Sequence, residues 1–559
     1  MLPLEWRRGL VCRSNCKIGR LPRPQPRILQ TVSVNCDKLC LFKLNEIFFM
    51  SFDVFQSYKP LRNKVAMLSV EEALAVIWAY CHYLQTNEFQ FPKEIEVDRG
   101  YLALDIPQKW ISEWELELIA KEVILNAGVV ASKDRSLRKW KVLSEIVNGL
   151  KSLENEIYGA YGSPKDVLVE FIRIAHRQFI WQGNPPNSIS TMRYYKIFNR
   201  PEIDKICEEK IGLNVWDIYM CGIGCMGLLL THPAIAIPFK TEVKALSIEK
   251  FEKFFTFTSK PIAALKAQLK PEQQYNADFA YAYSSLRAFP LIRMTYQGSE
   301  ALVCPLMTLL YWRFTGGLYY ELIGVPEFAN AFGDGFQGYV GEVIERACPD
   351  PFRRLGEIDY TVGKAKKRSV DWIVADETAA LFVECKSKRL SLGAKVSLSD
   401  PKPLEADIDS MAAAVVQLYK TILDYRGNAY PHFPTEDGRK IFPTVVTLEN
   451  WRMFGPVMLN KLTEAVTRRL ASEGLSRELV EQMPYSIWAI EDLEVGLQIM
   501  HANGIAGVME GKLGDPQKRE WDWHGYMTNQ YPKSFPAKRL FDDQYDEMFA
   551  NLYAAQGSA

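Results

Sequence analysis

The chain has 559 residues, of which 48% are hydrophobic and 24% are charged. This composition excludes a disordered tail, a collagen-like fibre and a coiled coil, and the length predicts about three or four globular units. Lys and Arg together number 67, as do Asp and Glu, so any attraction to phosphate or to anionic lipid must come from local clusters. Eleven cysteines are too few for a disulfide scaffold of this length, which predicts a reduced, cytoplasmic protein.

The first 49 residues differ from the rest of the chain. Basic residues dominate before position 30, and Pro22, Pro24 and Pro26 stand in a stretch that cannot be helical. We interpret residues 1–49 as a basic extension: a flexible phosphate-binding arm, a transit-like segment, or sequence upstream of the true start. The last interpretation is favoured, because Met50 opens a stretch of ordinary globular composition.

Residues 50–329 are predicted to form a large, mostly helical region, in one or two subdomains. Apolar residues recur at helical spacing in 70–84, behind Ser69 as a suitable N-cap, and again in 114–125 and 165–179. A helical region of this size suits target recognition or assembly. We therefore expect it to contact a partner protein or a second copy of the chain.

One apolar run, residues 218–239, carries no charge and has the length to cross about 30 Å of hydrocarbon as a helix. His232 and Pro233 interrupt it, which leaves about fourteen continuous apolar residues, the length of a buried core helix. The sequence therefore predicts a core helix here and no association with a membrane.

After residue 330 the pattern changes to short strands between two helices. A helix is predicted over 338–346, three strands over 358–362, 370–375 and 381–385, a second helix over 404–425 and a fourth strand over 441–448. This order predicts an α/β domain with a small mixed sheet, within residues 330–500. Residues 501–559 are assigned to a C-terminal extension.

Three charged residues lie inside the predicted strands. Asp371 lies in one apolar strand, and Glu384 and Lys386 lie two apart in the next, so the strand period of two places Glu384 and Lys386 on one face. A hairpin would bring Asp371 beside them. Charges inside apolar strands are costly unless they are paired or bound to a metal. Carboxylate oxygens suit Mg²⁺ or Mn²⁺, which indicates metal-dependent phosphodiester hydrolysis.

Asp371 followed by Glu384-Cys385-Lys386 resembles the PD-(D/E)xK motif of the restriction-endonuclease-like nuclease superfamily, over about residues 338–448. The order of flanking elements is similar to that family's core. The resemblance implies catalytic roles for Asp371, Glu384 and Lys386, with both acids as metal ligands. It also implies a further catalytic, metal-binding acid on the preceding helix, where Glu342 fits, with Glu345 as a substitute. Val370 stands where the motif has Pro, which leaves the metal ligands unchanged.

Basic residues flank these strands and are candidates for contact with nucleic-acid phosphates. A polar residue on the helix after the third strand often assists in the family, and Gln417 or Lys420 could fill that place. The alternative for the basic residues is a solvated hairpin end. The predicted nucleic-acid-binding residues are Lys364, Lys366, Lys367, Arg368, Lys388, Arg389 and Gln417.

Two other patterns resemble functional motifs. Residues 222–227 match GxGxxG, but no strand–turn–helix context surrounds them, so a nucleotide site is not favoured. Two CxxxC pairs in the basic extension could hold zinc, although the segment is a doubtful part of the protein. HExxH, GxSxG and GxxxxGK[ST] are absent from the sequence. The cysteines of the CxxxC pairs are Cys12, Cys16, Cys36 and Cys40.

The sequence thus predicts a metal-dependent nuclease, following a helical region, that acts as an endonuclease on DNA in preference to RNA. DNA, and defence against foreign DNA as the role, rest on the resemblance alone. Three alternatives stay open: an ordinary cross-strand ion pair at a surface hairpin, a nucleic-acid-binding or assembly protein that keeps the fold without catalysis, and an RNA-cleaving toxin.

Overall fold

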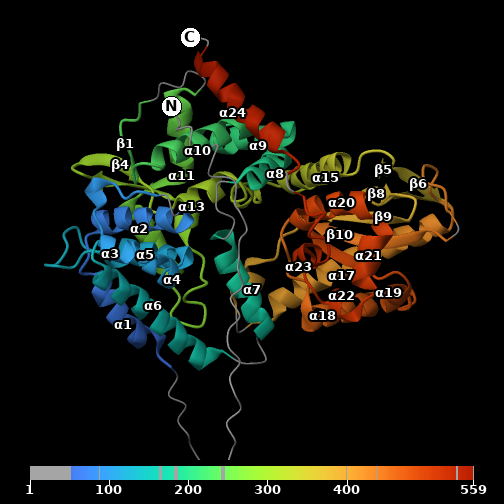
Figure 1. Ribbon diagram of the computed structural model, residues 1–559, viewed down its shortest axis with the longest axis horizontal. Coiled ribbons are helices and arrows are strands. Elements are labelled where there is room, and N and C mark those ends of the chain that lie inside the picture. The colour runs from blue at the N-terminus through green and yellow to red at the C-terminus, as the bar shows by residue number, and fades with distance from the viewer. Residues whose placement is uncertain are drawn as a thin grey trace, which may run out of the picture. The chain divides into compact units, whose positions relative to one another are not determined.

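The computed structural model describes residues 52–86, 89–162, 167–181, 187–240, 246–397, 400–436, 438–536 and 539–557 (Figure 1). Residues Val54–Ala559 form one compact unit, separate from Met1–Asp53. The predicted basic extension, with its four cysteines, lies outside the described residues.

The predicted helical region is present. Helix α2 is apolar on all sides, and its buried residues run without a break from Ala73 to Tyr83, as expected of a core helix. Helix α5 begins at a capping box in which Ser112 and Glu115 satisfy each other's backbone donors. The helices of the region are α1 (Val54–Val65), α2 (Val70–Gln85), α3 (Arg99–Leu102), α4 (Ile106–Trp110), α5 (Glu113–Asn126), α6 (Trp140–Tyr161), α7 (Val167–Gln178), α8 (Ser188–Phe198), α9 (Pro201–Ile211), α10 (Val215–Leu229), α11 (Ile248–Thr258), α12 (Ile262–Glu272), α13 (Met307–Phe314) and α14 (Leu318–Leu322), with short 3₁₀ turns at Lys93–Ile95, Phe179–Trp181 and Ser285–Arg287.

The GxGxxG segment lies inside helix α10 and not in a loop. A Cβ atom at Gly222 would lie 2.4 Å from the ring of Phe314, so this glycine allows α10 and α13 to pack closely. Within the described ranges no single helix is long and apolar enough to cross a membrane. Helices α9 and α10 meet that criterion only as a pair, which is bent by 64°.

The helical region also contains a four-stranded sheet that the sequence pattern did not predict. Its order is β1-β4-β3-β2, and β3 and β4 form an antiparallel hairpin. The turn consists of Gln297 and Gly298, both at positive φ (49° and 79°), as a two-residue hairpin of this hand requires. The strands are β1 (Ala234–Ala236), β2 (Ser259–Pro261), β3 (Leu291–Tyr296) and β4 (Ser299–Val303).

The second half of the chain contains a five-stranded mixed sheet of order β11-β10-β9-β8-β5. Strand β8 pairs antiparallel with both β5 and β9, whereas β9, β10 and β11 run parallel. Helices α15 and α20 lie above the sheet and α17 and α18 below it in the view of Figure 1. The strands are β5 (Arg353–Gly356), β8 (Trp372–Ala375), β9 (Ala379–Lys386), β10 (Lys440–Thr447) and β11 (Ser486–Ala489); the helices are α15 (Phe328–Ala347), α16 (Leu392–Val396), α17 (Lys402–Arg426), α18 (Gly455–Ser472), α19 (Leu479–Gln482), α20 (Ile490–Asn503), α21 (Ile505–Leu513), α22 (Pro516–Arg519), α23 (Trp523–Gln530) and α24 (Asp542–Gly557).

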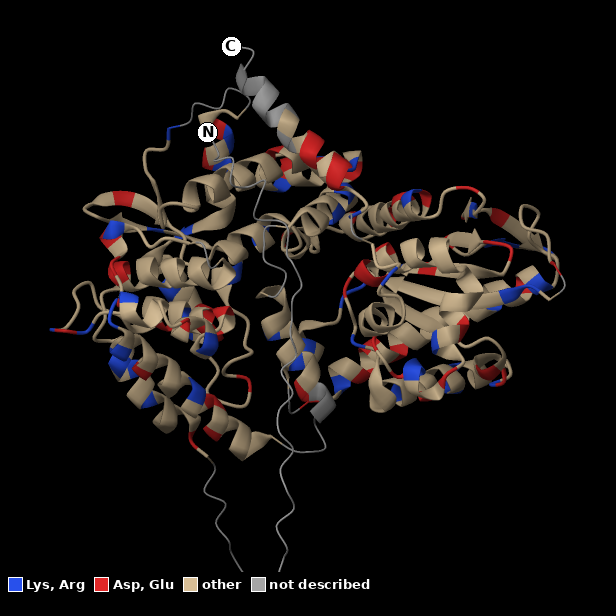
Figure 2. Cartoon of the chain, in the orientation of Figure 1, with Lys and Arg blue, Asp and Glu red and all other residues tan. Residues whose placement is uncertain are grey.

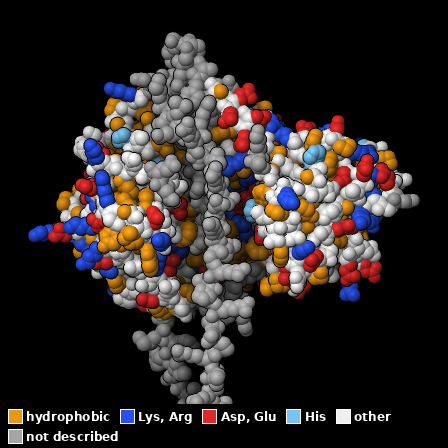
Figure 3. All heavy atoms as spheres, in the orientation of Figure 1, with side chains coloured by type: hydrophobic (Ala, Val, Ile, Leu, Met, Phe, Trp, Pro, Cys, Tyr) orange, Lys and Arg blue, Asp and Glu red, His pale blue; other side chains and the backbone are white. Residues whose placement is uncertain are grey.

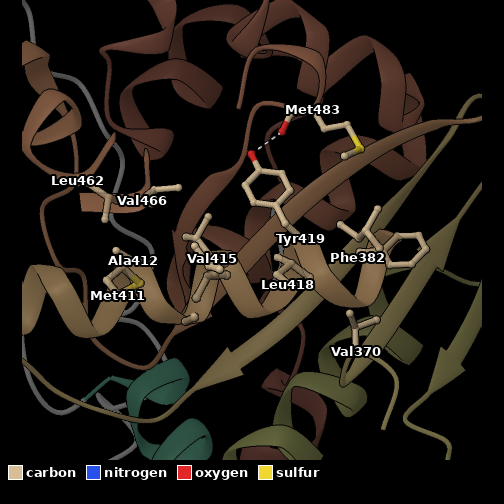
Figure 4. Close-up of a cluster of buried hydrophobic side chains, with 14 of the residues drawn as sticks. Val370, Phe382, Met411, Ala412, Val415, Leu418, Tyr419, Leu462, Val466 and Met483 are labelled. Carbon is tan, nitrogen blue, oxygen red and sulfur yellow. Dashed lines mark hydrogen bonds between the residues drawn. The ribbon is translucent and has the colours of Figure 1, made fainter. Parts of the chain in front are cut away.

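The core of this half lies between the sheet and α17. Phe382 of β9 and Leu418 and Tyr419 of α17 are fully buried and lie together (Figure 4). The Tyr419 hydroxyl donates to the carbonyl oxygen of Met483 at 2.8 Å, which satisfies the one polar atom of that side chain. The opposite face of the sheet presents Trp372, whose ring lies against Gly341 of α15, where a Cβ atom would come within 2.2 Å.

Two segments lie elsewhere than the sequence pattern indicates. The predicted strand over 358–362 is not in the main sheet; it forms β6 (Asp359–Val362) and pairs with β7 (Ala365–Arg368) in a separate exposed hairpin. The first strand of the main sheet is β5, which is short and begins with two consecutive arginines, so it lacks the apolar pattern that identifies a strand. Residues 501–559, assigned to an extension, pack on the rest of the unit: the Ile505 amide donates to Asp376 at 2.7 Å, and Arg346 pairs with Asp543 at 2.8 Å.

Candidate active site

The antiparallel pairing of β8 and β9 places Asp371 beside Glu384. Asp371 lies directly before β8 and not inside a strand as predicted, because the paired register begins at Trp372, opposite Val383. Its carboxylate is still close enough to Glu384 for the charge of Glu384 to act on it. Asp371 Oδ2 accepts a hydrogen bond from the Cys385 amide at 2.6 Å. This bond fixes the carboxylate at the point where the two strands part.

Lys386 completes the group that the sequence predicted. Its ammonium donates to Glu384 Oε1 at 2.7 Å, as expected for residues two apart on one strand face. The side chain of Glu384 is 13% exposed and that of Lys386 38% exposed, so the pair is open to solvent on the lysine side. The structure thus brings Asp371, Glu384 and Lys386 together.

Asp371 is the member of the group whose ionised form is least favoured. Burial, and then the charge of neighbouring Glu384, raise the pKa of Asp371 to about 7, although the Cys385 amide and Lys386 oppose the shift. Burial disfavours the ammonium of Lys386, but the attraction of Glu384 outweighs it and raises the pKa of that lysine. The Lys386 ammonium is therefore close to two carboxylates, those of Asp371 and Glu384, and forms a hydrogen bond with Glu384.

A further acid, Glu357, stands at this group and was missed in the sequence. Gly356, the last residue of β5, pairs with Trp372, and Glu357 directly follows it, next to the segment that contains Asp371. Its charge contributes to the raised pKa of Asp371. Glu357 also lies 3.7 Å from Arg368. The sequence placed the first strand one segment too late, and this put Glu357 in a turn instead of at a strand end.

Glu342 has a different environment from the other predicted ligands. Lys196 of α8 donates to Glu342 Oε2 at 2.5 Å, and Arg200 lies 4.0 Å from the other carboxylate oxygen. Over the ranges that the structure describes, no three His, Cys, Asp or Glu side chains converge as a metal-binding group. The structure therefore joins Asp371 and Glu384 as a pair, and gives Glu342 partners in the helical region. Glu345 is exposed on the same helix.

The predicted nucleic-acid-binding residues divide into exposed and engaged side chains. Lys364 and Lys366 are exposed on the β6–β7 hairpin. Lys367 pairs with Asp424 at 2.7 Å, and Arg368, 74% exposed, lies near Glu357. On the other side, Lys388 lies 3.3 Å from Asp407. Gln417 is exposed on α17, whereas its alternative Lys420 pairs with Glu473 at 2.8 Å.

Arg389 lies in the interior and not on a surface that phosphate could reach. The residue is 7% exposed, and its guanidinium donates to the carbonyl oxygen of Gly316 at 3.1 Å. The same group lies 4.3 Å from the ring centroid of Tyr319 and 3.5 Å from Glu449. Arg389 thereby ties the end of β9 to the helical region.

Lys and Arg are interspersed with Asp and Glu along the described residues of both halves of the unit (Figure 2). On the face in Figure 3, side chains of both signs are visible on either half, in small groups. Attraction to a polyanion would therefore depend on the few exposed lysines near the site.

No protein-family model, curated protein or solved structure matches the chain.

Proposed function

We propose that the protein is a metal-dependent nuclease that hydrolyses phosphodiester bonds, with DNA as the favoured substrate and endonucleolytic cleavage as the mode. The observation that carries the proposal is the proximity of the Asp371 and Glu384 carboxylates where β8 and β9 meet, while Lys386, among the described residues, donates to Glu384 only. Two carboxylates at such a position repel each other unless a further cation joins them.

The donor set fits Mg²⁺ or Mn²⁺. These ions prefer oxygen ligands, and Mg²⁺ typically takes one or two carboxylates and completes its shell with water and substrate phosphate oxygens. Asp371 and Glu384 would hold the ion. Glu342, the third ligand that the resemblance implies, is the partner of Lys196, so we give it a secondary role. When bound, the ion supplies positive charge that polarises the scissile phosphate.

The protein's own groups would act on the water and on the substrate. Lys386 is part-exposed, so its ammonium can orient the attacking water and offset negative charge that develops on the phosphate. Asp371, with its pKa near 7, exchanges a proton near neutral pH until a cation favours the ionised form. Lys364 and Lys366 would contact the nucleic-acid backbone from the hairpin.

The order of elements supports the proposal. Helix α15, the antiparallel strands β5, β8 and β9, helix α17 and the parallel strand β10 follow one another along the chain. This is the order that the resemblance to the PD-(D/E)xK superfamily implies, with β5 in place of the segment predicted as the first strand. DNA as the substrate, and defence against foreign DNA as the role, rest on that resemblance.

The test is cleavage of supercoiled plasmid by the purified protein with Mg²⁺ or Mn²⁺. We expect nicking by the wild type and a loss of about 100-fold or more in Asp371→Ala and Lys386→Ala, because each removes a group needed at the reacting phosphate. Glu377→Ala and Lys402→Ala, which remove exposed charges of the same types elsewhere, are the matched controls and should cleave normally.

Other outcomes would replace the proposal. Intact DNA with a salt-sensitive gel shift would identify a non-catalytic nucleic-acid-binding protein. Intact DNA with degraded cellular RNA would identify an RNA-cleaving toxin. Equal cleavage by the wild type and both site variants would point to a contaminating nuclease and reject this site.

A further inference from the structure

A small pocket lies inside the helical region, between α5, α7 and the segment that follows α12. Its cavity volume is small, about 20 Å³, and it opens to solvent. The pocket is remote in sequence from the candidate active site and has a different character, because basic groups dominate its polar lining. The residues that matter here are Trp114, Lys121, His176, Arg177, Ser284 and Arg287.

Lys121 is the unusual member of this lining. The residue is 2% exposed, yet in the part of the chain that the structure describes it makes no hydrogen bond and has no carboxylate oxygen within 4.0 Å. Burial lowers the pKa of Lys121, against the attraction of Glu122, Glu272 and Glu117. A lysine side chain this buried is almost always paired, so a Lys121 ammonium that reaches only the pocket is unusual.

The three acids whose charges act on Lys121 are bound to other groups. Glu117 accepts hydrogen bonds from both Nε and Nη2 of Arg287, at 2.6 and 2.8 Å. The other two are engaged as well: Glu122 accepts from Tyr58, Asn126 and Gln273, and Glu272 accepts from the Ser285 amide at 2.8 Å. The carboxylates nearest to Lys121 therefore satisfy other donors and leave its ammonium for a group from outside the chain.

Other groups of the pocket also have unused hydrogen-bonding capacity. Arg177 gives Nη1 and Nη2 to Glu154 at 2.8 Å each, and its Nε is buried without an acceptor among the described residues. Burial, together with the charges of Arg287 and Lys395, keeps the pKa of His176 well below its usual range. The imidazole is thus neutral and can donate one hydrogen bond. Lys121 of α5 and His176 of α7 both line the pocket, and neither has a hydrogen-bond partner among the described residues.

We infer that this pocket binds a small oxyanion, either inorganic phosphate or the phosphate group of a phosphomonoester, with Lys121 as its counter-ion. An oxyanion suits the site because it presents several acceptor oxygens, one for each separate donor, whereas a halide presents a single centre. The inference does not depend on the proposed nuclease activity.

The test measures phosphate binding by the full chain in the presence of EDTA, which removes divalent metal and so prevents any metal-dependent reaction. Equilibrium dialysis with radiolabelled phosphate at constant ionic strength should show one saturable site. Lys121→Met should weaken binding by about 10- to 100-fold, because a charge-assisted hydrogen bond is removed. Lys133→Met, which removes an exposed lysine of the same region, should bind as the wild type does.

Two further readouts decide the inference. Phosphate should raise the melting temperature of the wild type more than sodium chloride of equal ionic strength, a result that needs no variant. If Lys121→Met does not fold, Lys121→Gln takes its place. Competition by adenosine monophosphate at lower concentration than phosphate would identify a phosphomonoester as ligand, and the reverse order would identify the free anion. No saturable binding to the wild type, or equal binding by Lys121→Met, would overturn the inference.

Discussion

Paired charges of the helical region and the charged group of the main sheet have different environments. In the helical region, Arg173 pairs with Glu170 and Arg177 with Glu154, each at 2.8 Å. At the edge of the main sheet, by contrast, Asp371 stands beside a second carboxylate, Glu384. Charges that serve the fold have partners within the chain. A charge that lacks one, such as Asp371 in the sheet or Lys121 in the helical region, indicates a partner from outside.

The largest expected effect comes from breaking an internal pair. Arg193 of α8 and Glu494 of α20 are buried and joined by two hydrogen bonds of 2.8 Å, with the Tyr339 hydroxyl as a third partner. Arg193→Met leaves an unpaired buried carboxylate and should lower the free energy of unfolding by about 3–5 kcal/mol, measured by urea denaturation.

The control for this prediction removes the other charge as well. The double variant Arg193→Met with Glu494→Gln should recover part of the loss, because no uncompensated charge remains. A loss below about 1 kcal/mol in the single variant would contradict the view that these pairs hold the fold.

The like-charged pair in the sheet should respond in the opposite direction. The folded pKa of Asp371, about 7, lies above the value of about 3.9 for an unfolded chain, so the folded state binds the proton more tightly. The contribution of Asp371 to stability is therefore present below pH 4 and is lost as the pH rises to 7. At pH 8 without divalent metal, Asp371→Asn should be more stable than the wild type by about 2 kcal/mol, after allowance for solvent screening.

The same denaturation series at pH 4 supplies the comparison for Asp371. There the wild-type carboxyl is protonated in the folded state, so the advantage of the Asn variant should nearly vanish. An advantage that is independent of pH would mean that the substitution acts through packing instead of charge.

A divalent cation should cancel part of this difference. At a free Mg²⁺ or Mn²⁺ concentration ten times the dissociation constant, binding to the folded state alone stabilises it by about 1.4 kcal/mol. We expect this gain in the wild type and none in Asp371→Asn, measured by thermal unfolding at pH 8 against EDTA. Equal stabilisation of both proteins would place the cation elsewhere.

The smallest effect is expected at the hairpin. Lys366 is exposed and forms no ion pair among the described residues, so Lys366→Ala should change stability by less than about 0.5 kcal/mol. If the lysine contacts a phosphate, the slope of log affinity for DNA against log salt should fall by about 0.9. An unchanged slope would remove the hairpin from the binding surface.

The elements that sequence reasoning found are those with a strong local pattern. Helix α17 was predicted over 404–425 because its apolar stripe spans six turns, and the structure extends it by only a few residues. Strands β8 and β9 were predicted because they are almost wholly apolar. Strand β5, with two arginines in four residues, carries no such pattern, and its pairing with β8 depends on contacts that a local window does not contain.

In the candidate active site, too, only the contacts that follow from a local pattern could be predicted. Asp371, Glu384 and Lys386 meet because strand pairing follows from the hairpin between them. The environment of Glu342 was not predictable, because its partner Lys196 is 146 residues away. Arg389 belongs to the same basic cluster in sequence as Lys388, yet it is buried whereas Lys388 is exposed. The presence of a charged residue in a sequence does not show whether its side chain is buried or exposed.

The contacts of Arg389 with the helical region bear on how the second half of the chain can be produced alone. A fragment that begins at residue 330 lacks the Gly316 carbonyl and the Tyr319 ring, both of which contact the Arg389 guanidinium. It also lacks Arg193, the partner of Glu494. Both charges would then lose these partners. The fragment should aggregate when expressed, and crystallisation or screening should begin from a chain that retains α8 through α14.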